Sequence, residues 1–163
     1  MNASTNKVAQ KLRMSSSGFT LIELMVTIAV LAIIVSIAAP NISTQLANQR
    51  VKSTAATLAN ALKEAKVESI IRRQNVTVVY NDASTSKTIT LRGSNTTASP
   101  IASYNYNVSS TLVSDPATIT FEPSKRVSSD VTYTICDTNT SASPRQIVVS
   151  KVANISNATG GTC

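Results

Sequence analysis

One carboxylate lies inside the long apolar run near the N-terminus, and its position calls for a chemical explanation. Glu23 stands close to the start of the run "GFTLIELMVTIAVLAIIVSIAAP", residues 18–40. A lone charge in hydrocarbon costs about 2.5–3.5 kcal/mol even on a lenient insertion scale, so such residues are usually retained for a partner. We therefore expect Glu23 to serve a partner, and a place in the first turn of a helix also suits its negative charge.

Few other residues offer chemistry. The chain has no His and only two Cys, so the commonest general base and transition-metal ligand is missing. The eight carboxylates are scattered and form no Asp-x-Asp calcium loop. Gly160 and Gly161 make a flexible approach to the last residue, with no phosphate-loop context. We predict that the protein is not an enzyme and holds no metal or cofactor.

The net charge of +7 raises the question of an anionic partner. Three basic residues, Lys7, Lys11 and Arg13, precede the apolar run and leave 12 Lys and Arg against 8 Asp and Glu. A remainder of +4 spread over the rest of the chain is a mild bias, so a solvated surface is the interpretation that we favour.

The element that must position Glu23 is a membrane-spanning helix. Residues 1–17 are polar and basic, whereas 19–39 are mostly Leu, Ile, Val and Ala, long enough at ~1.5 Å per residue to span ~30 Å of hydrocarbon. Positive charge before the run predicts a cytoplasmic N-terminus, with the rest of the chain on the far side. Two alternatives are a secretory signal cut at 36–38, for which the apolar run is too long, and a plain uncleaved anchor, which leaves the carboxylate unexplained.

The segment Gly18-Phe19-Thr20-Leu21-Ile22-Glu23-Leu24 resembles the class III signal of type IV pilins and type II secretion pseudopilins. The resemblance joins a basic leader, Gly then Phe at the cut, Glu four residues after Phe, and an apolar run that ends near Pro40. It implies that prepilin peptidase removes residues 1–18 and methylates the new N-terminal Phe19. It also implies that Glu23 faces the N-terminal amine of a neighbouring subunit, or its own, in a filament.

Residues 40–74 are expected to continue the helix as an amphipathic half, after a kink or local melting at Pro40. Its apolar residues recur at spacings of 4, 3, 4 and 3 and should pack on a sheet, while charged residues such as Arg50 turn elsewhere. These apolar residues are Val51, Ala55, Leu58, Leu62 and Ala65. Arg72 and Arg73 suit a helix C-terminus, and Asn75 is expected to take the left-handed cap conformation.

The rest of the chain, 75–163, is predicted to be a periplasmic head rich in strands. Alternating β-branched residues predict strands at 76–80, 87–92, 117–122, 131–136 and 145–152, with 101–108 as a sixth candidate at an edge. The stretches 93–100, 109–116 and 137–144 read as loops. The expected fold is α+β and pilin-like, a long N-terminal helix packed on one or two small antiparallel sheets.

The two cysteines, Cys136 and Cys163, permit one intramolecular disulfide, which the oxidising side of a bacterial membrane favours over two free thiols. The bridge would stabilise the head by roughly 3 to 4 kcal/mol on the chain-entropy model. Because it ties down the last residue, it also implies that 137–163 is ordered.

Residues 61–80, in which a helix runs through Arg-Arg-Gln-Asn straight into a Val-rich strand, resemble the H-type (GspH) pseudopilins and the FimT- and FimU-like minor pilins. The resemblance implies a subunit that begins in the bacterial inner membrane and ends on the pilus at the cell surface. Its implied partners are other minor and major pilins, prepilin peptidase and the inner-membrane assembly platform. A major pilin is an alternative.

Three roles compete within this resemblance: a minor pilin that primes assembly at the pilus tip, a subunit that captures DNA for natural transformation, and a pseudopilin of type II secretion. DNA-binding FimT-like proteins carry a C-terminal Gly-Arg-x-Arg motif, which this chain lacks. Four basic residues remain as a weak candidate patch for phosphates: Lys125, Arg126, Arg145 and Lys151. We therefore place tip priming first and DNA capture second.

Overall fold

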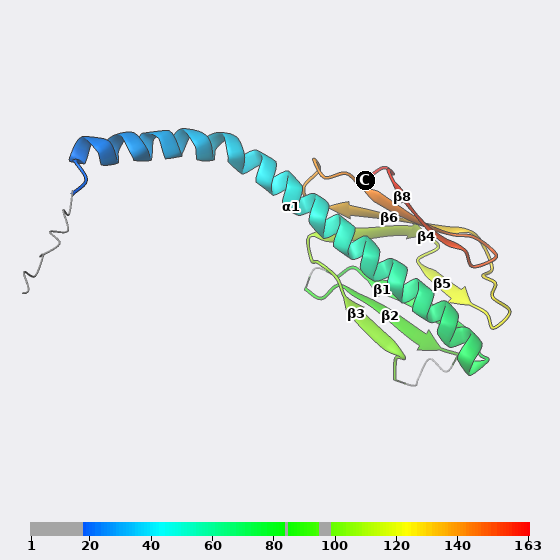
Figure 1. Cartoon of the computed structure of the whole chain (residues 1–163). Coiled ribbons are helices and arrows are strands. Elements are labelled where there is room, and N and C mark those ends of the chain that lie inside the picture. Colours follow the sequence, from blue (N-terminus) through cyan, green and yellow to red (C-terminus); the bar gives the residue numbers. More distant parts are fainter. Residues whose placement is uncertain (1–17, 84, 95–98) are drawn as a thin grey trace, which may run out of the picture. The chain divides into compact units, whose positions relative to one another are not determined.

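The computed structural model describes residues 18–83, 85–94 and 99–163 and divides the chain into two units, Met1–Ala38 and Ala39–Cys163. One helix, α1 (Leu21–Arg72), begins in the first unit and ends in the second (Figure 1). The strands of the second unit are β1 (Val76–Asn81), β2 (Thr88–Gly93), β3 (Ala102–Asn105), β4 (Ser110–Asp115), β5 (Thr118–Phe121), β6 (Val131–Asp137), β7 (Arg145–Val149) and β8 (Ile155–Thr159).

Residues 38–41 are helical, so local melting, one of the two outcomes expected at Pro40, is absent, and the alternative of a kink stays a prediction. Proline removes one backbone donor, and the remaining hydrogen bonds on either side can keep a helix continuous.

The strands form two antiparallel four-stranded sheets, in the orders β3-β2-β1-β5 and β4-β6-β7-β8. In the second unit α1 lies across both sheets (Figure 1). The apolar face of α1 that was predicted to pack on a sheet is fully buried, and it forms one hydrophobic core with alternate residues of the strands. That face comprises Val51, Ala55, Leu58, Leu62 and Ala65. The α+β architecture predicted from the sequence, with the helix packed on antiparallel sheets, is confirmed.

The C-terminal turn of α1 differs from the expectation. Arg73, and not Asn75, takes the left-handed conformation, with φ of 53°. The Gln74 N–H donates to the Ser69 carbonyl and the Arg73 N–H to the Ile70 carbonyl, each at 3.3 Å. These two bonds form a Schellman motif, which satisfies carbonyls that the helix leaves free and offsets the cost of a left-handed arginine.

The prediction of a loop at 109–116 is wrong, because these residues contain β4. β4 is rich in polar residues, and its first position, Ser110, is buried. The Thr54 hydroxyl of α1 donates to the Ser110 hydroxyl at 3.1 Å. Burying a hydrogen-bonded serine costs little free energy. Because a serine then occupies a core position, the sequence lacks the alternation of apolar and polar residues from which strands were predicted.

The other differences lie at the C-terminal strands. β7 ends at Val149 rather than at residue 152, because a turn follows in which the Ala153 N–H donates to the Ser150 carbonyl at 2.7 Å. β8 was not expected at all. It is an edge strand of its sheet, and four of its five side chains are exposed. A strand of this kind carries no apolar pattern to read.

A buried lysine ties the two sheets together. The Lys87 ammonium, just before β2, donates to the Ser110 carbonyl of β4 at 2.7 Å and lies 3.0 Å from Asp82 Oδ1. The Tyr106 hydroxyl donates to the same carboxylate oxygen at 2.7 Å. The pKa of Tyr106 is raised chiefly by burial of its hydroxyl and secondly by this hydrogen bond to Asp82. The lysine is therefore paired, as a buried charge must be.

Candidate functional site

The first turn of α1 is capped by Thr20. The Glu23 N–H donates to Thr20 Oγ1 at 3.2 Å, and the Leu24 N–H donates to the Thr20 carbonyl at 3.2 Å. Thr-x-x-Glu is the spacing of a capping box, and a carboxylate at its third helical position suits the positive end of the helix dipole. This cap was not among the features expected, although the spacing of Thr20 and Glu23 in the sequence is its signature.

The apolar part of α1 presents its side chains outward. The window Leu21–Ala38 has a mean hydropathy of 2.7 and no buried residue, and Phe19 and Leu21 are 75% and 76% exposed. By length and composition this segment is able to cross a membrane. So much apolar surface requires lipid or other protein around it.

Nothing in the part of the chain that the structure describes requires a glycine at position 18. A Cβ atom added there would meet no atom within 4 Å, and its φ is not in the left-handed region. The basic residues Lys7, Lys11 and Arg13 of the expected leader lie outside the described residues.

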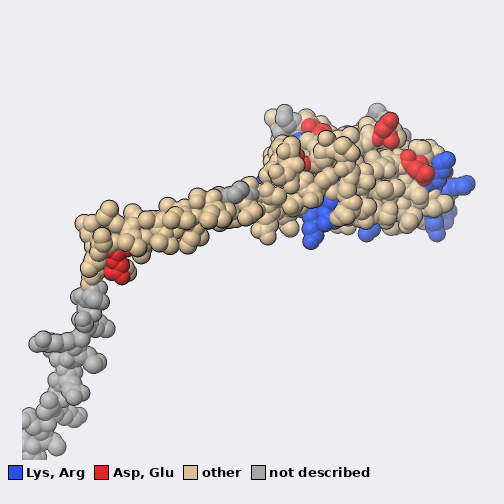
Figure 2. Space-filling model, turned by 90° about the horizontal axis from the view of Figure 1, so that it is seen from above, with Lys and Arg blue, Asp and Glu red and all other residues tan. Residues whose placement is uncertain are grey.

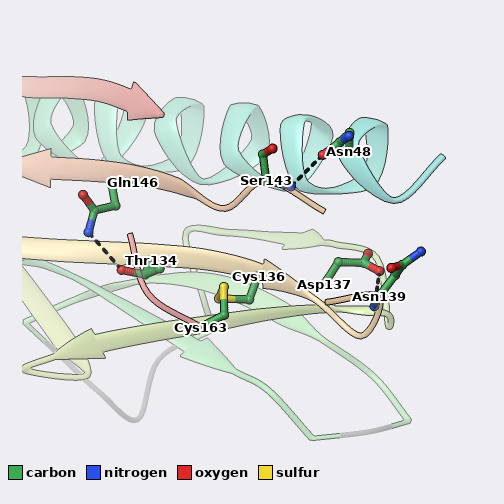
Figure 3. The surroundings of a disulfide bond; sticks show 8 residues. All are labelled: Asn48, Thr134, Cys136, Asp137, Asn139, Ser143, Gln146 and Cys163. Carbon is green, nitrogen blue, oxygen red and sulfur yellow. Dashed lines mark hydrogen bonds between the residues drawn. A yellow bond between two sulfur atoms is a disulfide. The ribbon is translucent and has the colours of Figure 1, made fainter. Parts of the chain in front are cut away.

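The C-terminal tail is held against β6 by a disulfide between Cys136 and Cys163, with a Cα–Cα distance of 5.9 Å (Figure 3). After β8 the chain turns at Gly160 and Gly161, which have φ of 122° and 111°. A Cβ atom on Gly161 would lie 2.9 Å from the Thr134 side chain. The glycine pair therefore makes a turn whose backbone conformation favours glycine at both positions, and at Gly161 a side chain would also collide with β6.

An ion pair beside the disulfide joins α1 to the end of β6. Arg50 donates from Nε to Asp137 Oδ2 and from its second terminal nitrogen to Oδ1, both at 2.9 Å. The Asp137 side chain is fully buried and that of Arg50 is 23% exposed. The Asn139 N–H also donates to the carboxylate, at 3.0 Å (Figure 3). The hydrogen bonds from Arg50, reinforced by that of Asn139, hold the pKa of Asp137 below its usual range.

Sequence reasoning missed this pair. Helical spacing places Arg50 off the apolar face of α1, but the end of β6 and the loop that follows it contact α1 beside Arg50. The Ser143 N–H of this loop donates to Asn48 Oδ1 at 2.8 Å (Figure 3). No signal in the sequence links residues this far apart.

The four candidate residues for phosphate binding do not form one patch. Lys125 and Arg126 directly precede Val127, whose N–H donates to the Lys151 carbonyl at 3.0 Å. The backbones of the basic residues Lys125, Arg126 and Lys151 therefore lie close together. Arg145 begins β7, whereas Lys151 follows its end, and a strand of this length separates them by ~15 Å. Figure 2 shows Lys and Arg gathered at the end of the head where α1 ends, with acidic residues beside them. In the described residues no group of three or more His, Cys, Asp and Glu is placed to hold a metal ion.

Comparisons with known proteins agree with this architecture. A model of the prokaryotic N-terminal methylation motif matches residues 13–39, and a model of the type II transport protein GspH matches residues 54–153, more than half of the chain. No curated protein matches the sequence.

Two crystal structures of the type IV minor pilin FimU from Pseudomonas aeruginosa are similar in fold. The form in space group P65 is 18% identical, with a TM-score of 0.58 over 69% of this chain and 98% of that one. The form in P21 is 17% identical, with a TM-score of 0.60 over 71% and 96%.

Proposed function

The chain belongs to the family of the type II transport protein GspH, and we propose that it is a minor pilin of a type IV pilus that primes assembly at the pilus tip. The observation that carries the proposal is the apolar stretch of α1, Leu21–Ala38, which has no buried residue and precedes the head in the chain. Lipid covers such a surface before assembly, and neighbouring subunits cover it in a filament. The methylation motif and the fold shared with a minor pilin support the choice.

Maturation begins with removal of residues 1–18, which places the apolar segment 19–39 at the new N-terminus. The amphipathic part, 40–74, and the head, 75–163, then follow on the periplasmic side. Gly18 supports this step, because the fold does not require a glycine there and a peptidase that needs a small residue before the cut does. Prepilin peptidase is the expected enzyme.

Glu23 is the proposed assembly residue. Its cap uses the backbone N–H and the Thr20 hydroxyl, so the carboxylate itself is not consumed by that bond. In an apolar filament core, the protonated amine of Phe19 from a neighbouring subunit neutralises this carboxylate. Because an unpaired carboxylate is costly there, the pair favours the register in which both charges are satisfied.

Two other roles within the family have a specific observation behind them. The matching family model is that of a type II transport protein, which favours a secretion pseudopilin. The adjacent Lys125, Arg126 and Lys151 favour weak DNA capture. With so few phosphate contacts, that affinity would be modest and would fall steeply with salt.

Deletion of the gene separates these roles when surface pili, DNA uptake and type II secretion are scored in the same strain. Loss of surface pili, restored by the wild-type gene, is the result that tip priming predicts. Normal piliation with lost DNA uptake would favour DNA capture, and normal piliation with lost secretion would favour the pseudopilin; either outcome would overturn the proposal.

A further inference from the structure

The peptide bond between Gly18 and Phe19 lies just outside the first turn of α1. Gly18, Phe19 and Thr20 are exposed and non-helical, and the helix begins at Leu21. The first carbonyl that accepts a helical hydrogen bond is that of Thr20, from the Leu24 N–H at 3.2 Å. Within the described part of the chain, no backbone N–H donates to the carbonyl of Gly18 or Phe19. The carbonyl of this peptide bond is therefore not tied into the helix.

The Thr20 side chain determines where the helix starts. Its Oγ1 accepts the Glu23 N–H at 3.2 Å, and this N–H is one of the four that a helix leaves without an intrahelical partner. A capping residue has a non-helical backbone, so the chain before Thr20 departs from the path of the helix. Thr20 thus ends the helix on its N-terminal side, one residue after the bond between Gly18 and Phe19.

The sequence before this bond contains other residues that could cap a helix. Residues 15–17 are three serines, and serine is among the preferred N-cap residues. A helix that began after Ser17 would include the bond in its first turn, and the Gly18 carbonyl would accept the N–H four residues later. Gly18 opposes this earlier start because glycine is a poor helix former. The choice between the two starts therefore depends on how well Thr20 caps.

Hydrolysis of the bond requires access to its carbonyl group. Water adds to the carbonyl carbon of Gly18, the C–N bond to Phe19 breaks, and the products are a carboxylate on Gly18 and a protonated amine on Phe19. The carbonyl oxygen gains negative charge on the way and needs a hydrogen-bond donor from the peptidase. In a helix that oxygen already accepts an N–H of the next turn. A bond outside the helix can be cut without first unwinding a turn.

We propose that Thr20 is a positioning residue for cleavage by prepilin peptidase: its cap holds the bond between Gly18 and Phe19 outside the helix, in the conformation that the peptidase cuts. The inference rests on the maturation proposed above. Thr20 acts through the conformation of the substrate and not by contact with the reacting atoms. The essential group is the hydroxyl oxygen, because a valine of the same shape would leave the Glu23 N–H without its acceptor.

Cleavage of the full-length protein in non-ionic detergent micelles by purified prepilin peptidase tests the proposal. Two variants separate the cap from the shape of the side chain. Thr20→Val keeps the shape of threonine and removes the acceptor, so it should lower kcat/KM by about two- to fivefold. Thr20→Asn changes the shape and restores a strong cap, so its kcat/KM should stay within about twofold of the wild-type value.

Thr27→Val is the matched control. The Thr27 hydroxyl donates to the Leu24 carbonyl at 2.8 Å, inside the helix and away from its cap, so the same substitution there should leave kcat/KM unchanged. A second measurement reports the conformation itself. In the uncleaved proteins with ¹³C-labelled Phe19, the Cα chemical shift of Phe19 should move towards the helical value in Thr20→Val, and not in Thr20→Asn or Thr27→Val.

The outcomes that contradict the proposal are distinct. Cleavage of Thr20→Asn as slow as that of Thr20→Val, or slower, would show that the peptidase recognises the threonine side chain itself. Cleavage of Thr20→Val at the wild-type rate or faster, or a Phe19 chemical shift that this variant leaves unmoved, would overturn the proposal as well. Failure of the maturation step looks different, because the wild-type protein would then stay uncut, and the role of Thr20 would fall with it.

Discussion

Removal of the disulfide between Cys136 and Cys163 should destabilise the head and release its edge strand first. The appropriate variant is Cys136→Ala with Cys163→Ala, which leaves no thiol to form other bridges. Cys136 is buried in β6 and Cys163 is exposed at the end of the chain. The bridge thus fixes a tail that crosses from β8 over β7 to β6.

The magnitude follows from the closed loop and from how little else holds its end. The bridged residues are 27 apart, for which the chain-entropy relation gives about 3.5 kcal/mol at 25 °C. Four of the five side chains of β8 are exposed, so without the bridge the strand frays in the folded state and recovers part of that entropy. We expect a loss of about 2–3.5 kcal/mol, which at ~4 °C per kcal/mol for a head of this size lowers Tm by about 8–14 °C.

Near-ultraviolet circular dichroism isolates the head, because the chain has no Trp and all four Tyr lie after residue 79. Melting curves should be compared among the wild type, the double alanine variant and a Thr162→Ala control in the same tail. Hydrogen exchange should show the amides of Ile155–Thr159 losing protection before those of β6. A Tm within about 2 °C of the wild type, or unchanged protection in β8, would show that the disulfide does not stabilise the head or hold its edge strand in this way.

Three further predictions concern maturation, assembly and acid stability. The processed protein should begin at methylated Phe19, eighteen residues shorter than the translated chain; mass spectrometry that finds Met1 retained, or a start at Ala39, would end the pilin interpretation. Glu23→Ala should be processed normally but be depleted from sheared pili, with Glu23→Asp intermediate in immunoblots, and normal incorporation of the alanine variant would contradict the assembly role. The folded-state pKa of Asp137 is lowered by Arg50, so its contribution to stability is present above the carboxyl's unfolded pKa and is lost as pH falls through the folded value. Asp137→Asn should therefore flatten the acid limb of a plot of Tm against pH, and an unchanged acid limb would show that the pair contributes nothing there.

The parts of the fold that were predictable from the sequence are those with an apolar period. The buried face of α1 repeats at helical spacing, and β1, β2 and β6 alternate β-branched residues, so both were readable without tertiary information. β4 and β8 were not predicted. β4 buries a serine against a hydroxyl of α1, and β8 is an edge strand with mostly exposed side chains. In both strands tertiary partners, and not side-chain polarity, decide the structure.

The candidate site divides in the same way. The class of the N-terminal segment and the position of Glu23 could be inferred from the sequence because both depend on residues that are neighbours in the chain. The cap that Thr20 supplies could have been inferred in the same way, since it lies three residues from Glu23. The ion pair of Arg50 with Asp137 joins residues 87 apart, and it depends on where the loop after β6 meets α1. Such pairs follow from the three-dimensional packing of sheets on a helix, which the order of residues does not display.

A subunit that primes assembly remains at the end of the filament, so its location on intact pili distinguishes this role from that of a shaft subunit. Antibodies against the head, applied to purified pili and visualised by immunogold electron microscopy, should label filament ends and leave the shafts bare if the protein is the priming minor pilin. The same antibodies should label no filament from the deletion strain complemented with Glu23→Ala. Labelling along the shaft, or no labelling on pili that the wild-type strain assembles normally, would show that the protein does not prime assembly at the tip.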